Sequence, residues 1–291
     1  MIRLFTDSAA NLPLGLAEKQ GATVLPFTFT LDGEECSPID PAFDGRIFYR
    51  AMREGAAVKT SMVNTAMFVD AFRTALQDGD DVLFIGISGG ISGTQQAARI
   101  AAEELREEFP DRTIAIVDSL GASLGEGLLV LEAATLIRRG EEMATITERL
   151  SRHIRHMCQC FTVDDLRYLR QGGRISGAAA MVGGLLGIRP VLVGDTEGHI
   201  VQSAKVRGAK QVLDALAERY DRFVLDRSQI VGIAHADNED GARYLLGRLH
   251  EKGLTGHDLT VCFEPVTGAH VGPGAVALFF FGRDRAELCG G

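Results

Sequence analysis

The sequence predicts an α/β protein whose first half forms an open parallel sheet and whose second half forms an α+β domain. In the first half, short apolar strands alternate with helices, which is the order of βαβ units. The predicted strand 82–87 is apolar without alternation, as in a parallel strand covered on both faces. In the second half, segments 189–193 and 199–203 flank a short polar loop and predict a hairpin. A length of 291 residues also suggests two domains, which we place at 1–159 and 160–291.

Turn and cap residues delimit the elements of the first half. Pro13 is typical of the first turn of a helix, and Gly21 is typical of its end. A strand follows in which Pro26 favours a sheet edge, and Asp40 then begins a helix that runs to Gly55. The elements predicted in this half are strands 2–6, 22–31, 82–87 and 113–117, helices 13–21, 40–55, 65–77 and 94–109, and a helix that ends near residue 139.

The second half has more closely spaced strands. Cys158 and Cys160 alternate with polar residues and predict one face of a strand. His270 lies in a stretch of small residues that predicts a Gly-Pro turn between two apolar strands. Besides the hairpin, the predicted elements are strands 230–235, 259–265 and 276–281 and helices 209–220 and 239–251.

Composition excludes several classes of protein. Hydrophobic residues make up 46% and charged residues 24% of the chain, which is typical of a globular protein. The net charge of −9 argues against a nucleic-acid partner. Asp7 and Pro13 interrupt any export signal, and no apolar run is long enough for stable membrane insertion. Five cysteines without disulfide or zinc spacing predict reduced thiols, so we expect a cytoplasmic protein with no metal or cofactor.

Hydroxyl-bearing turns follow several predicted strands. Ligands of open parallel sheets bind at the carboxyl ends of the strands, where helices begin. This rule selects the turns Asp7-Ser8, Ser88–Thr94 and Asp118-Ser119. We add Thr60-Ser61, which precedes a helix-cap signal at Asn64-Thr65. In the turn Ser88–Thr94, three glycines allow close approach to a ligand, and Ser92 and Thr94 offer donors beside free helix amides. The glycines are Gly89, Gly90 and Gly93. The turn could hold a carboxylate or phosphate, or it could be a Gly-rich connection in which a hydroxyl caps the helix.

Two motifs of known chemistry bear on the function of these turns. No G-x-x-x-x-G-K-[ST] loop is present, so this chain does not bind ATP in that way. The residues 86–90 match G-x-S-x-G, the nucleophile elbow, with Ser88 as nucleophile and Asp237 and His270 as the other members of a triad. A serine hydrolase or esterase is therefore the alternative function.

The ordered set of motifs resembles the DegV family over nearly the whole chain. The matching residues are Thr6-Asp7-Ser8, Leu12-Pro13, Thr60-Ser61, Ile91-Ser92-Gly93-Thr94, Val117-Asp118-Ser119, Phe161-Thr162-Val163, Leu166, Tyr168-Leu169, Gly172-Gly173-Arg174-Ile175, Ile188-Arg189-Pro190, Lys205-Val206-Arg207-Gly208, His270 and Gly272-Pro273-Gly274-Ala275. The resemblance implies a long-chain fatty acid as ligand in a buried tunnel between two domains. It also implies a non-catalytic subunit that presents the acid to a separate ATP-binding kinase subunit, which forms the acyl-phosphate.

The resemblance assigns roles to individual residues. It implies that Thr60, Ser61, Ser92 and His270 bind the carboxylate. Four more residues are expected near the head group or the partner: Gly93, Thr94, Arg174 and Arg207. The sequence departs from the family pattern at Met62-Val63-Asn64 and at Gly89, which puts chain selectivity and head-group geometry in question.

Two further residue sets are hypotheses about the tunnel and the partner. The candidate tunnel walls, which could equally be ordinary core, are Phe27, Phe29, Ile188, Leu278 and Phe280. The basic residues that could meet an acidic partner, or form a solvated face, are Arg167, Arg170, Arg174, Lys205, Arg207 and Lys210. From this set we predict that Arg174→Glu lowers acyl-phosphate formation and leaves fatty acid binding nearly intact. About ten buried methylenes at ~0.8 kcal/mol each would supply most of the affinity.

Overall fold

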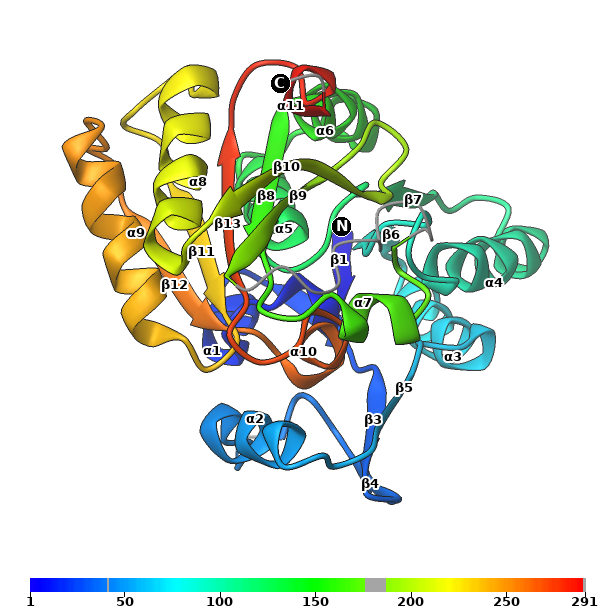
Figure 1. The fold of residues 1–291 in the computed structure, drawn as a ribbon. Coiled ribbons are helices and arrows are strands. Elements are labelled where there is room, and N and C mark those ends of the chain that lie inside the picture. Colours follow the sequence, from blue (N-terminus) through cyan, green and yellow to red (C-terminus); the bar gives the residue numbers. More distant parts are fainter. Residues whose placement is uncertain (41, 176–186, 290–291) are drawn as a thin grey trace.

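A computed structural model describes residues 1–40, 42–175 and 187–289 (Figure 1). The first half contains the predicted parallel sheet, which has four strands in the order β2-β1-β6-β7. Its strands are β1 (Ile2–Asp7), β2 (Ala22–Leu25), β6 (Asp81–Gly86) and β7 (Ile114–Asp118). No helix in these ranges is both long enough and apolar enough to cross a membrane.

The second half contains a six-stranded sheet in the order β10-β9-β8-β13-β11-β12. Neighbouring strands are antiparallel except β11 and β12, and β9 with β10 forms the predicted hairpin. The strands are β8 (Met157–Thr162), β9 (Ile188–Gly194), β10 (Ile200–Arg207), β11 (Val231–His235), β12 (Asp258–Cys262) and β13 (Val276–Phe281). The boundary that we placed after residue 159 falls inside β8.

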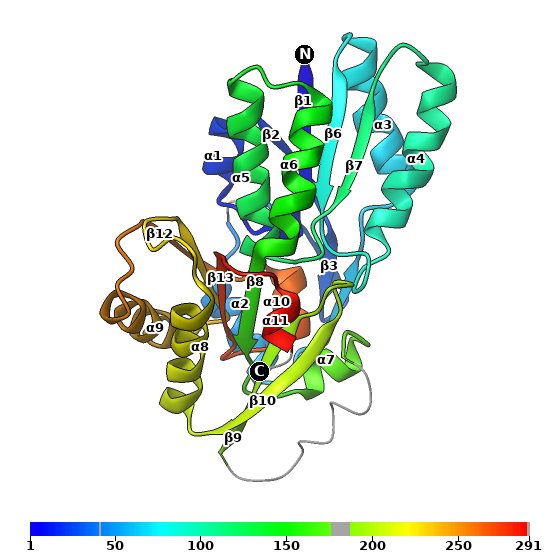
Figure 2. The ribbon, with the colours of Figure 1, turned by 90° about the horizontal axis from the view of Figure 1, so that it is seen from above.

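Helix α5 (Leu124–Arg138) lies between the two sheets and contacts strands of both (Figure 2). Its apolar residues face all directions, which is typical of a buried helix. The outer faces of the sheets are covered by other helices, so the layers alternate between helix and sheet. These helices are α3 (Thr65–Gln77) and α4 (Thr94–Glu108) on the first sheet, and α8 (Ala209–Phe223) and α9 (Glu239–Glu251) on the second. Helix α6 (Met143–His156), which we did not predict, packs beside α5, and α1 (Leu14–Lys19) packs beside β2.

A small third sheet in the order β4-β3-β5 was not predicted. It consists of β3 (Thr28–Leu31), β4 (Glu34–Cys36) and β5 (Val58–Ser61). The prediction of one strand over 22–31 was wrong, because β2 ends just before Pro26 and β3 joins the other sheet. The helix predicted from Asp40 begins later, as α2 (Gly45–Arg53), with Asp44 accepting hydrogen bonds from its first amides; Pro41 lies outside the described residues. Figure 1 shows α2 and this sheet extending from the body of the molecule.

The strand register separates two apolar cores on the faces of the second sheet. Cys158 and Cys160 lie in the core beneath α8 and α9, which confirms their predicted common face. Phe161 and Phe279 face α5 instead. Three shorter helices complete the half: α7 (Arg167–Gln171), α10 (Pro265–Val271) and α11 (Ala286–Cys289). The predicted Gly-Pro turn is present at residues 273–274, but His270 lies before it, in the last turn of α10.

Candidate functional site

Thr60 and His270 form the polar centre of the site. Thr60 lies on β5, which pairs with β3, and α10 packs against both strands. Glu264 accepts hydrogen bonds from the amides of Val266 and Thr267 and thereby begins α10. The Thr60 hydroxyl and His270 Nε2 are 3.1 Å apart, with donor and acceptor set by the tautomer. A tertiary contact between segments 210 positions apart in the sequence therefore forms this pair.

The imidazole of His270 is neutral at physiological pH. Burial and, to a smaller extent, the charge of the nearby Arg174 lower its pKa to about 4. Gly172 lies against the imidazole ring, where any larger side chain would collide with Nδ1. A neutral His270 contributes a hydrogen bond to a ligand and no net charge.

The Ser88–Thr94 loop lies beside this pair. Arg174 donates from Nε to the carbonyl oxygen of Ile91 at 3.0 Å, and its charge helps to lower the pKa of His270. On the other side, a β-carbon at Gly93 would lie 2.8 Å from Met62 Sδ, which places the end of β5 against the loop. The structure thus brings the predicted residues Thr60, Ser61, Ser92, Gly93, Arg174 and His270 into one region.

Ser92 begins the turn into helix α4. Its Oγ lies 2.9 Å from the Thr94 hydroxyl and accepts from the Thr94 amide at 3.3 Å. Thr94 is buried, Ser92 is half-buried, and Ser61 and Gly93 are exposed. The helix dipole and the free amides of the first turn favour an anion here. Arg207 lies apart from this turn, exposed at the end of β10 opposite Ile188.

An apolar cavity lies between the two main sheets, next to the polar residues. It encloses about 490 Å³ including its open mouth, and only a small part is wide enough for a water molecule. Its wall includes Ile91, the neighbour of Ser92, and Val271, the neighbour of His270. The lining residues are Ile91, Leu120, Gly121, Ala122, Ser123, Gln159, Phe161, Gly194, Gly198, Ile200, Phe263, Val271, Ala277 and Phe279.

The five predicted wall residues are not among those lining residues. Leu278 and Phe280 point into the core under α8 and α9, because successive side chains of a strand point to opposite faces. Their neighbours Ala277 and Phe279 line the cavity instead. Phe27 and Phe29 belong to the core that includes the small sheet, and Ile188 begins β9.

Two other hollows lie away from Thr60 and Ser92. The larger encloses about 1340 Å³ including open solvent, between α5, α6 and the end of β13. The second encloses about 1060 Å³ by the same measure and has Asp7 and Glu264 in its wall. Neither wall contains residues of the Ser88–Thr94 loop, whereas the inter-sheet cavity has Ile91 of that loop in its wall.

Comparison with known proteins agrees with the geometry. The model of a family described as uncharacterised proteins of the DegV family matches residues 1–283. The chain belongs to the DegV family. It is 37% identical over 284 residues to a DegV domain-containing protein of Clostridium perfringens, covering 97% of this chain and 98% of the relative.

Solved DegV structures share the fold over their whole length. A fatty-acid-binding DegV protein from Thermus thermophilus superposes with a TM-score of 0.87 at 32% identity, covering 97% of this chain and 99% of that one. A fatty-acid-binding DegV protein from Streptococcus agalactiae gives 0.84 at 30% identity, covering 98% and 99%. The parallel sheet and the second sheet domain are therefore those of fatty-acid-binding DegV structures.

The residues of the alternative hydrolase triad are engaged elsewhere in this DegV protein. The Ser88 hydroxyl donates to the Gly198 carbonyl oxygen at 2.9 Å, and the side chain is fully buried. His270 pairs with Thr60, and Asp237 forms an ion pair with Arg53. Since each member has a different partner, the nucleophile-elbow interpretation is wrong.

The acids Asp7, Glu126 and Glu264 are buried in the DegV fold, and sequence analysis did not single out Glu126 or Glu264. Thr6 donates to Glu126 Oε1 at 2.8 Å, and Asn11 accepts from the Glu264 amide at 2.9 Å. Asp7 accepts from the amides of Ala9 and Ile87, so the predicted Asp7-Ser8 ligand turn is occupied by internal hydrogen bonds. A signal was present in the sequence, because Glu126 stands among apolar and glycine residues at the start of α5.

Proposed function

We propose that this DegV protein binds a long-chain fatty acid with its carboxylate at Thr60, Ser92 and His270. The acyl chain would occupy the cavity between the sheets. One observation carries the proposal. Val271, which follows His270, and Ile91, which precedes Ser92, are part of the apolar wall. Fatty-acid-binding relatives at 30% and 32% identity support it.

The site offers what each end of such a ligand requires. A carboxylate leaving water needs hydrogen bonds, and charge-assisted bonds contribute about 1.5–3 kcal/mol each. The Thr60 and Ser92 hydroxyls, the neutral His270 and the first amides of α4 are available as donors. Because most of the cavity is narrow, we expect the acyl chain to enter by displacing side chains of the wall.

Removal of the two hydroxyls tests the carboxylate end. We expect Thr60→Val with Ser92→Ala to weaken binding of a long-chain fatty acid about tenfold or more, because charge-assisted hydrogen bonds are lost. Titration of delipidated protein by isothermal calorimetry measures this effect. The fatty alcohol of equal length should lose much less affinity, and Ser151→Ala on the exposed side of α6 is the matched control. Equal losses for acid and alcohol would refute the assignment.

We further propose that the protein presents the carboxylate to an ATP-dependent fatty acid kinase subunit. Ser61 and Gly93 are exposed, so the acid end of the site adjoins the surface. The chain has no phosphate loop of its own. The exposed Arg170 and Arg207 are candidates for contact with an acidic partner. Arg174 is a poorer test than we predicted, because it hydrogen-bonds the Ile91 carbonyl beside Ser92.

Charge reversal at the surface tests presentation. We expect Arg170→Glu with Arg207→Glu to lower acyl-phosphate formation severalfold in a mixture with a fatty acid kinase subunit and ATP, because complementary charge speeds association. Fatty acid affinity, measured in parallel, should stay unchanged. Arg152→Glu on α6 is the matched control. Turnover equal to that of the unmodified protein would contradict this role.

A further inference from the structure

One polar side chain interrupts the apolar wall of the inter-sheet cavity. Gln159 lies on β8 between Met157 and Phe161, which face the same core, and it is only 7% exposed. Its oxygen accepts from the Ala122 amide at 3.3 Å, and its nitrogen donates to the Leu120 carbonyl at 3.2 Å. Both bonds are long, and a carboxamide can make more than two. Gln159 therefore keeps capacity to bond a further group.

The surrounding backbone makes room for this carboxamide. A β-carbon at Gly121 would lie 2.8 Å from the amide of Gln159, and one at Gly125 would lie 2.6 Å from its oxygen. Gly121 in the loop and Gly125 in the first turn of α5 therefore leave room for the carboxamide of Gln159.

A buried cation lies directly behind this position. Arg285 is 2% exposed, and its Nη2 donates to the same Leu120 carbonyl at 2.8 Å. Among the residues that the structure describes, its Nε and Nη1 have no hydrogen-bond partner. Gly194 lies against both groups, because its β-carbon would be 2.6 Å from Arg285 Nη2 and 3.5 Å from Gln159 Nε2. Unpaired buried donors are costly, so this region favours an acceptor.

Gln159 lies away from the carboxylate end of the cavity. Helix α10, which carries His270, leads into the Val276 end of β13. Along β13, Ala277 pairs with Phe161, and two residues further Phe279 pairs with Gln159. Each residue of a strand advances about 3.3 Å, so the carboxamide lies deeper in the cavity than Phe161.

We propose that Gln159, backed by Arg285, binds an oxygen atom on the acyl chain distant from the carboxylate. The preferred ligands would then be hydroxy- or oxo-substituted long-chain fatty acids. This inference rests on the proposed fatty acid site. A plain alkyl chain would leave the Gln159 carboxamide without a new partner, whereas a hydroxyl or oxo oxygen would accept from its amide.

The test compares octadecanoic acid with its mid-chain monohydroxy isomers on the delipidated full-length protein, by calorimetry. We expect at least one isomer to bind about two- to tenfold more tightly than octadecanoic acid, the effect of one net hydrogen bond. The preference should depend on hydroxyl position. It should disappear in Gln159→Leu and shrink in Arg285→Met. A merely structural role would lower all affinities in parallel.

Two results would overturn the inference. One is octadecanoic acid binding as tightly as every isomer, which would mean that internal water satisfies these groups. The other is a hydroxyl preference that survives Gln159→Leu. If that variant does not fold, the isomer series on the unmodified protein still decides. Absence of binding by any of the acids would instead refute the proposed function itself.

Discussion

Glu126 is a carboxyl group in the middle of the molecule. Burial raises its pKa well above the usual range, and the Asp7 charge adds to the effect. Burial likewise raises the pKa of Asp7 and of Glu264 to about 7. Groups with a raised folded-state pKa bind more protons folded than unfolded. Their contribution to stability is therefore full below the unfolded pKa and is lost as pH rises towards the folded value.

We predict that Glu126→Gln is nearly neutral at about pH 5, within about 1 kcal/mol, because the amide resembles a protonated carboxyl and still accepts from Thr6. Between about pH 5 and pH 8, the unmodified protein should lose more free energy of unfolding than this variant. Urea unfolding at both pH values measures the difference. Glu103→Gln, exposed on α4, is the control. Identical pH profiles for Glu126→Gln and the unmodified protein would show that Glu126 is ionised when folded.

At the site, the sequence predicted individual residues better than their surroundings. Thr60, Ser92 and His270 stand out as hydroxyls and a histidine among glycines and turn signals, and the structure gathers them. The helix that carries His270 was not predicted, since a seven-residue helix with an internal glycine has little periodicity. Gln159 and Arg285 were missed because a single polar residue in a strand or a terminal segment carries no pattern.

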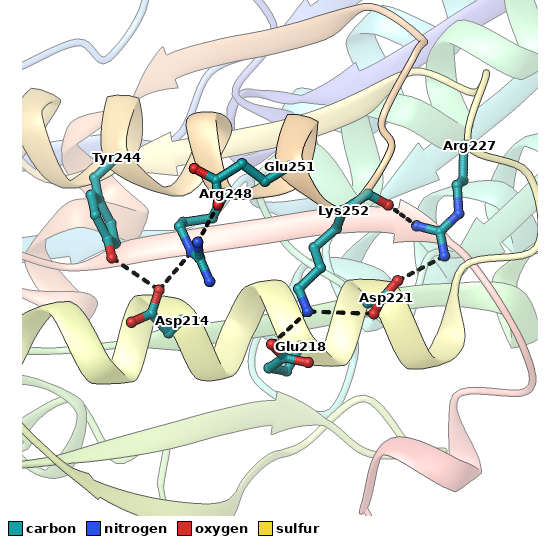
Figure 3. Close-up of polar contacts among 8 residues, drawn as sticks. All are labelled: Asp214, Glu218, Asp221, Arg227, Tyr244, Arg248, Glu251 and Lys252. Carbon is teal, nitrogen blue, oxygen red and sulfur yellow. Dashed lines mark hydrogen bonds and ion pairs between the residues drawn. The ribbon is translucent and has the colours of Figure 1, made fainter.

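Helices α8 and α9 are joined both by apolar packing and by surface ion pairs (Figure 3). Arg248 Nε lies 2.8 Å from Asp214, and Lys252 Nζ lies 2.6 Å from Glu218. Tyr244 also donates to Asp214 at 3.0 Å. These groups are solvent-exposed to varying degrees, so salt screens their attraction. The apolar residues beneath them hold the helices to the sheet.

Two adjacent residues of α9 should separate these contributions. We expect Leu249→Ala to cost ~2–5 kcal/mol of unfolding free energy, because the side chain is fully buried. Arg248→Gln should cost far less, and its effect should vanish at high salt because its ion pairs with Asp214 and Glu251 are screened. Thermal unfolding at low and high salt measures both. A salt-independent loss in Arg248→Gln would show that this arginine acts through packing.

Elements with complete local signals were predicted closely. Helices α3 and α9 have the predicted bounds, because Asn64 and Asn238 cap amphipathic segments. The bounds of β13 were also correct. The small sheet was missed because β4 and β5 are short and polar, and they form only by pairing with β3.

Helix α5 couples the two main sheets into one structure. It contacts β1 and β6 on one side and β8, β11 and β13 on the other. The inter-sheet cavity lies at the N-terminal end of α5, where Ser123 precedes the helix. A ligand in this cavity touches residues from both halves of the chain, so its binding should stabilise both together.

We predict a single unfolding transition that shifts as a whole to higher temperature when a long-chain fatty acid is added. Free ligand at about a hundredfold above Kd would add about 2.7 kcal/mol. Differential scanning calorimetry of delipidated and loaded protein measures the shift. The Thr60→Val with Ser92→Ala variant should need more ligand for the same shift. Two transitions, of which one ignores the ligand, would contradict a shared cavity.

The sequence by itself determined the parallel sheet, the hairpin, most helices and the hydroxyl residues of the candidate site, because these depend on periodicity, caps and turns within a short stretch. Only the tertiary structure decided which strand faces line the cavity, that Ser88 bonds to Gly198, and that Glu126, Gln159 and Arg285 are buried. These features depend on contacts between segments far apart in the chain. A local pattern does not determine which distant face will cover a given side chain.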